Sequence, residues 1–197
     1  MNYIKMFDIK SIFPNSNPNA IFFEIETEYE LGASTWLGYK QQTQQDLDNM
    51  SQLAIHVFED IFEAYSKSIP ILVNHWDMVR DMYMLNQFEA FKQGKFTSQI
   101  FIDETQEEKK EQIYLETTIG SINYRNILTK FVHRDYDDKN NKNSRIFFVL
   151  PDRQMYLLYF DSEIIIGANN LNDLKPLFIK YQEHVGLARK EKFLAQG

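Results

Sequence analysis

The sequence predicts an α+β protein in which a long helix and a C-terminal helix pack on a mixed, mainly antiparallel sheet. Three observations support this fold class. Apolar residues follow a helical period from about Thr43 to Lys67, apolar and acidic residues alternate over residues 21–31, and three short apolar runs with turn signals between them fill residues 145–167. A chain of 197 residues with 44% apolar side chains is long enough for one core. We therefore expect a single domain over residues 1–197.

The first half of the chain contains a turn, a strand and a regular helix. The turn signal Pro14–Asn19 ends an amphipathic opening, and the strand at 21–31 follows until Gly32 interrupts it, with a second short strand near Trp36. A buried strand is expected at Ile71–Val73. The helix between these strands places apolar side chains three and four residues apart, at Leu47, Met50, Leu53, Ala54, Val57, Phe58, Ile61, Phe62 and Tyr65.

The second half predicts a hairpin, a helix and a meander. Residues 77–92 fit a helix only loosely. The elements expected after them are strands at 99–103 and 112–119, a helix at 121–133, a polar loop at 135–143, antiparallel strands at 145–150, 155–160 and 163–167, and a last helix from about Asn170.

Four glutamates alternate with apolar or neutral side chains in the predicted strand at 21–31. Side chains two positions apart share a face of a strand, so Glu24, Glu26, Glu28 and Glu30 would line one face about 7 Å apart. Like charges at that spacing repel unless water or a cation screens them. Three interpretations follow: a solvated face rimmed by Lys and Arg of the C-terminal helix, recognition of a basic partner, or metal-dependent chemistry.

The net charge of −7 is concentrated at the start of the chain. Residues 1–60 contain three basic and nine acidic side chains. This argues against nucleic acid as a ligand, because phosphate contacts dominate that affinity, and it favours a basic partner. No apolar window approaches 18 residues, the N-terminus lacks the features of a signal peptide, and there is no cysteine. We therefore expect no membrane association and a cytoplasmic location.

Motifs for catalysis or metal binding are incomplete. His133–Asn140 has the spacing of a protein-kinase catalytic loop, but the glycine-rich loop and the other kinase motifs are missing. The pair Asp135 and Asp137 begins like a calcium loop, which then lacks its glycine and its final glutamate. The four histidines are scattered, and no nucleophile elbow or phosphate-binding loop occurs. The sequence therefore predicts no enzyme, cofactor or metal, although it leaves open a triad assembled from scattered residues.

Two segments resemble a bacterial family known as a domain of unknown function, DUF3885. Leu174–Tyr181 is similar to the helix Leu-x-Pro-Leu-Tyr-x-x-Tyr that closes that family, and Ala54–Phe62 resembles its Ile-Phe-x-x-x-Phe helix. The turn before the last helix departs from the family, because Tyr159–Glu163 lacks its second Asp, Arg and Gly. The resemblance implies the strand, helix and strand order and a bacterial origin, and it implies no activity.

These observations favour a small acidic binding protein. We expect an immunity protein that neutralises a cognate basic toxin, such as a nuclease, by occlusion, with Glu24, Glu26, Glu28 and Glu30 contacting the toxin. The alternatives are a hydrolase using Glu24 or Glu26 as catalytic carboxylates, and a regulatory subunit of a larger complex. The oligomeric state stays open.

Overall fold

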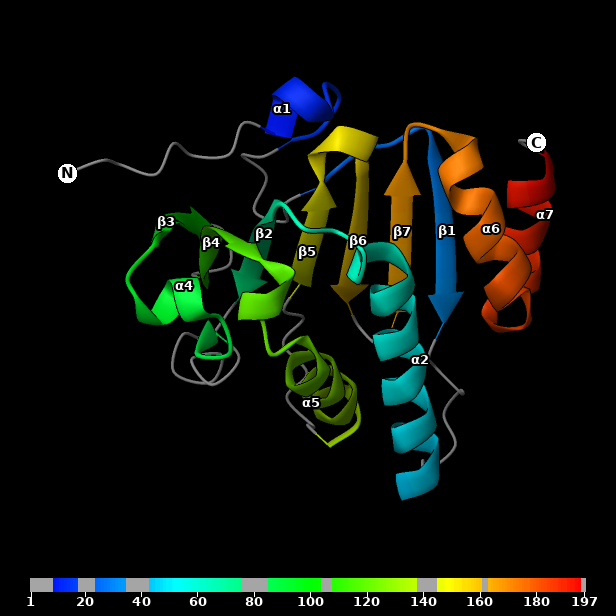
Figure 1. Cartoon of the computed structure of the whole chain (residues 1–197), viewed down its shortest axis with the longest axis horizontal. Helices are drawn as coiled ribbons and strands as arrows, with labels where there is room; N and C mark the ends of the chain where they lie inside the picture. Colours follow the sequence, from blue (N-terminus) through cyan, green and yellow to red (C-terminus); the bar gives the residue numbers. More distant parts are fainter. Residues whose placement is uncertain are drawn as a thin grey trace.

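Seven strands form one antiparallel sheet in a computed structural model that describes residues 9–17, 24–34, 43–75, 85–103, 108–137, 145–160 and 163–195 (Figure 1). The strands are β1 (Tyr29–Ser34), β2 (Ser68–His75), β3 (Phe96–Asp103), β4 (Glu108–Thr118), β5 (Arg145–Leu150), β6 (Met155–Phe160) and β7 (Glu163–Ala168). Their order is β1-β7-β6-β5-β2-β4-β3, and each neighbouring pair is antiparallel. The predicted fold class, the β3–β4 hairpin and the β5–β6–β7 meander are thereby confirmed.

The longer helices gather on one face of the sheet (Figure 1). Helices α2 and α5 lie against each other over the middle strands, and α6 packs along β1 and β7. The helices in the described residues are α1 (Ile9–Ile12), α2 (Gln44–Phe62), α4 (Glu89–Lys92), α5 (Tyr124–Asp137), α6 (Leu171–Tyr181) and α7 (Leu187–Ala195).

Helix α2 forms where the sequence predicts it, because both its start and its apolar face are specified locally. Thr43 and Asp46 make a reciprocal capping box, in which each side chain accepts a hydrogen bond from the other residue's backbone N–H. The apolar face is buried in the main core, with Phe58 and Phe62 fully enclosed. The Phe58 ring stacks on Phe62 at 4.7 Å and meets Phe148 of β5 edge-on at 4.9 Å.

The other face of the sheet carries a second, smaller core. Almost every residue of β5 and β6 is buried, so these two strands are covered on both sides. Opposite the helices, the cover comes from Ile9 and Phe13 of the N-terminal segment and from Ile25. These side chains pack on a cluster formed by Leu72, Tyr114, Phe147, Val149, Tyr156 and Leu158.

Helix α7 protects the edge of the sheet at β1. The Arg189 side chain lies against Gly32 at the place where a Cβ would stand, and it donates a hydrogen bond of 2.8 Å to Glu163 of β7. On the helix-covered side, Phe193 stacks on Phe178 of α6 at 4.6 Å. An edge strand covered in this way offers less backbone for pairing with another chain.

Several predicted boundaries are wrong. The backbone becomes a strand only at Tyr29, while residues 25–28 are irregular, so 21–31 is not one strand. The long helix ends at Phe62 rather than Lys67, and α5 continues to Asp137, so the polar loop expected from Asp135 begins later. Within the expected helix at 77–92, the described residues 85–92 are interrupted: Leu85 is helical, a turn follows, and the short α4 begins at Glu89. The strand near Trp36 and residues 21–23, 77–84 and 138–143 lie outside the described residues.

We predict that Phe62→Ala lowers the free energy of unfolding by about 3–5 kcal/mol, because the change removes a fully buried ring and leaves a cavity against Phe58 and Phe148. Urea denaturation would measure this loss. As a control, Ile179→Ala on the exposed side of α6 should change stability by less than about 0.5 kcal/mol. A loss below about 1 kcal/mol for Phe62→Ala would contradict the packing.

Candidate functional site

The four glutamates, called here the acidic strip (Glu24, Glu26, Glu28 and Glu30), all lie on the surface. The residues between them alternate inward: Ile25 is buried, and Thr27 and Tyr29 are half-buried. The exposed and buried positions therefore alternate over residues 24–31 as predicted, but the prediction that the four glutamates share one face of a strand is wrong. Only Glu30 belongs to β1, and Ile25 lies in the second core while Leu31 lies in the main core on the other face of the sheet. All four residues of the strip are exposed and come from one continuous stretch of backbone.

Hydrogen bonds from the backbone hold the strip in place. The Glu26 N–H donates to the hydroxyl of Ser16, which is buried, at 2.9 Å. The Glu28 N–H donates to the side-chain oxygen of Asn169 at 3.2 Å, and the Asn17 N–H donates to the Glu24 carbonyl at 3.2 Å. The backbone is anchored on both sides of Ile25. The strip would therefore lose little conformational entropy when it binds a partner.

Cations of the protein lie near the two ends of the strip. At one end, Glu24 lies near Arg145, whose pKa is lowered by burial and raised in part by the charge of Glu24. At the other end, Glu30 lines a small hollow together with Arg189 and Lys192 of α7. Within the described part of the chain, the central carboxylates of Glu26 and Glu28 have no ion-pair or hydrogen-bond partner. The expected rim of C-terminal cations is thus present at one end of the strip only.

Tyr156 of β6 connects the strip to the second core. Its ring is buried against Phe13 and Phe147, at centroid distances of 6.1 and 5.7 Å. Its hydroxyl donates a hydrogen bond of 2.8 Å to the carboxylate of Glu30. Burial and the nearby charge of Glu30 raise the pKa of Tyr156 well above its usual value, so the hydroxyl keeps its proton and remains a donor.

Gly167 of β7 makes room for this tyrosine. A Cβ at Gly167 would overlap the Tyr156 ring and the hydroxyl of Thr27, which lies between two glutamates of the strip. Glycine is therefore required at position 167 because the Tyr156 ring and the Thr27 hydroxyl lie so close to its backbone, and not because of its backbone conformation.

We predict that Gly167→Ala lowers the free energy of unfolding by about 1–3 kcal/mol, because the buried ring must shift. Hydrogen exchange at the Glu26 and Glu28 amides should also become faster. The control is Gly120→Ala, where a Cβ would meet open space. If both variants unfold like the wild type, Tyr156 does not hold the strip as described.

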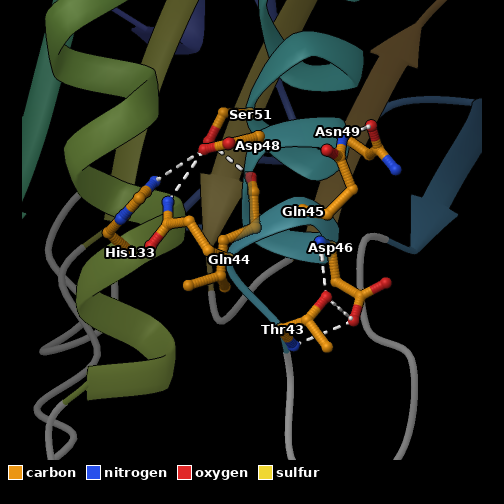
Figure 2. Close-up of polar contacts among 9 residues, drawn as sticks. Thr43, Gln44, Gln45, Asp46, Asp48, Asn49, Ser51 and His133 are labelled. Atoms are coloured by element: carbon orange, nitrogen blue, oxygen red, sulfur yellow. Dashed lines mark hydrogen bonds and ion pairs between the residues drawn. The ribbon is translucent and has the colours of Figure 1, made fainter.

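A second polar cluster joins the start of α2 to α5 (Figure 2). The Asp48 carboxylate accepts a hydrogen bond of 2.9 Å from Gln44 and lies 3.9 Å from Nε2 of His133. Ser51 lies one turn further along α2, but its buried hydroxyl donates to the Leu47 carbonyl at 2.8 Å. A nucleophilic serine would instead donate to the histidine. These three side chains therefore do not form a catalytic triad, and His133 belongs to a helix and not to a kinase-like loop.

A pocket of about 230 Å³ opens at the C-terminal end of α2. It lies between the end of this helix, the turn η1 (Ile119–Ser121) and the start of α5. We call it the α2-end pocket, and its lining residues are Phe58, Glu59, Glu63, Tyr65, Ile119, Gly120 and Tyr124. Its walls are thus aromatic and apolar, with two carboxylates.

Two tyrosine hydroxyls of this pocket are fixed by carboxylates. Tyr124 donates to Glu59 at 2.8 Å, and Arg125 makes an ion pair with the same carboxylate. Tyr65 donates at 3.2 Å to Asp152 in the turn η2 (Pro151–Arg153), which also pairs with Lys67 at 2.5 Å. Burial, followed by the neighbouring carboxylate, raises the pKa of each tyrosine. Both rings are therefore held as neutral walls of the pocket.

Sequence reasoning missed this pocket, because its residues come from two distant parts of the chain. One signal was present in the sequence: Glu59, Asp60 and Glu63 stand at the negative end of the α2 dipole, where no basic residue occurs in the last turn. Acidic residues at that end are unfavourable unless other elements balance them.

Comparisons with known proteins identify a family and no closer relative. The family model described as Domain of unknown function (DUF3885) matches residues 7–185, so α7 lies beyond the matched part. Neither the curated proteins nor the solved structures contain a match. Among the described helices, none has the length and apolar character needed to cross a bilayer. In the same segments, no three His, Asp or Glu side chains lie close enough together to hold a metal ion.

Proposed function

The chain belongs to the DUF3885 family, whose description assigns no function, and we propose that it is a binding protein that captures a basic protein partner through the acidic strip. The observation that best supports this proposal is the unpaired centre of the strip. Glu26 and Glu28 are exposed on a backbone that Ser16 and Asn169 anchor. Two carboxylates held outward without a cation gain most from a partner that brings one.

The proposed mechanism is electrostatic steering followed by occlusion. Opposite charge raises the rate of encounter, and complementary charges then fix the orientation of the two proteins. Glu24 and Glu30, which have Arg145 and the cations of α7 nearby, would flank the contact and exclude like-charged partners.

Within this class, we propose an immunity protein that covers the active site of a cognate basic toxin, such as a nuclease. An inhibitor of this kind works by presenting a preformed surface and needs no chemistry of its own. The rigid anchoring of the strip and its excess negative charge suit that task.

We predict that Glu26→Lys combined with Glu28→Lys slows association with the partner about 10- to 100-fold and raises the dissociation constant. Wild-type association should also slow as salt rises, because charges are screened beyond about 8 Å at physiological ionic strength. The measurement is a pull-down of the protein encoded by the adjacent gene, followed by stopped-flow association rates at two salt concentrations.

The matched control reverses two exposed glutamates elsewhere, Glu116→Lys with Glu183→Lys, and produces the same change in net charge. This variant should associate much faster than the strip variant. Equal rates for both variants would show that only net charge matters and would contradict recognition through the strip. A metal-dependent hydrolytic turnover abolished by Glu24→Gln would replace this proposal with that of a carboxylate-dependent hydrolase.

A further inference from the structure

The α2-end pocket has an unbalanced negative charge. Three carboxylates surround the negative end of the helix dipole, and other helices provide partners for two of them. Glu59 is paired with Arg125 of α5. Asp60 accepts hydrogen bonds from Lys180 at 2.7 Å and from Tyr181 at 2.6 Å, both on α6. Although partial burial opposes ionisation of Asp60, these contacts lower its pKa below the usual value. Within the described residues, the carboxylate of Glu63 has no partner.

The walls of the pocket suit a planar cation. The Tyr124 ring stacks on Phe58 at 4.4 Å and has the guanidinium carbon of Arg125 5.7 Å from its centroid, so the Tyr65 ring is the wall that remains for a ligand. The electron-rich faces of tyrosine rings attract cations, and guanidinium groups also stack on them. Because Asp152 and Glu59 hold the hydroxyls of Tyr65 and Tyr124, these rings line the pocket before any ligand arrives.

The size of the pocket points to a single side chain. Its volume of about 230 Å³ is smaller than the roughly 300–1,000 Å³ that is usual for cofactors and drug-sized ligands. A guanidinium group on an apolar stem matches the combination of a carboxylate, tyrosine rings and the apolar Ile119.

Hydrogen bonds around the turn η2 connect the acidic strip with the α2-end pocket. Glu28 of the strip is bonded to Asn169, and the Asn169 N–H donates to the Gln154 carbonyl at 3.2 Å. Gln154 directly follows η2, whose Asp152 holds Tyr65 of the pocket. The two sites are therefore linked through contacts of this turn.

We propose that the α2-end pocket receives an arginine side chain, with the guanidinium group paired to Glu63 and stacked on Tyr65. This inference rests on the proposed function for its source, an arginine of the basic protein partner, which would anchor the complex that the acidic strip attracts. Buried arginines in preformed pockets are among the residues that contribute most to binding energy at protein interfaces.

The test uses the full chain and a small probe, so that it does not depend on the partner. Nα-acetyl-arginine amide is titrated against the ring NMR signals of Tyr65 and Tyr124, and the neutral isostere Nα-acetyl-citrulline amide is titrated in parallel. We expect saturable shifts with a millimolar dissociation constant for arginine, and at least tenfold weaker binding for citrulline, equal to about 1.4 kcal/mol.

Two variants locate the binding. Glu63→Gln, which keeps the shape of the side chain, should weaken arginine binding about tenfold without lowering the melting temperature, since it removes a charge from the negative end of α2. The matched control Glu183→Gln should bind like the wild type. Absence of shifts at tens of millimolar probe, equal binding of citrulline, or unchanged binding by Glu63→Gln would each overturn the inference.

The two proposals can fail separately. If the probe binds as expected but Glu26→Lys with Glu28→Lys leaves partner association unchanged, the pocket stands and the strip mechanism fails. If partner association depends on the strip while the probe leaves both tyrosine rings unaffected, the strip mechanism stands and the arginine pocket is wrong.

Discussion

The arrangement of this protein depends on two neighbouring strands that are apolar on both faces. Strands β5 and β6 contain the runs Ile146–Leu150 and Met155–Phe160, almost fully buried, so neither side of the sheet can be left to water. The helices cover one side. The other side requires a separate cover, which the chain forms from its N-terminal segment and Ile25. Ile25 points inward to close the second core, and its neighbours Glu24 and Glu26 are exposed on either side of it.

The opposite face shows how unfavourable charge is accommodated at a helix end. Acidic residues at the end of α2 repel one another and the helix dipole. Arginine and tyrosine of α5 offset Glu59, and lysine and tyrosine of α6 offset Asp60, so these contacts also join three helices across the core. Both α5 and α6 approach the last turn of α2 through these partners. The α2-end pocket lies on the α5 side of that turn, where the Glu63 carboxylate has no partner among the residues that the structure describes.

Local signals in the sequence predicted much of the fold but not the limits of β1 or the pocket. The capping box at Thr43 and the apolar stripe that ends at Phe62 specify α2 within one segment. Strand β1 is different, because its described pairing is to β7 alone, and Tyr29 is already opposite Ala168, the last residue of that strand. Residues before Tyr29 have no partner residue on β7 in that register. Exposed and buried side chains therefore alternate over residues 24–28 although the backbone there is not a strand. The pocket unites Tyr65 with Tyr124, and no local pattern encodes such a contact.

The acidic strip and the α2-end pocket have one feature in common. In each, some carboxylates have a cation nearby and a neighbouring carboxylate has none among the described residues. Arg145 and α7 lie near the ends of the strip, and α5 and α6 provide partners for two carboxylates of α2. Within the described residues, the centre of the strip and Glu63 have none. Hydrogen bonds anchor the backbone of Glu26 and Glu28, and hydrogen bonds to carboxylates fix the two tyrosine rings around the pocket. A surface that recognises cations needs both properties, since preorganised carboxylates lose little entropy and gain the full interaction when a cation arrives.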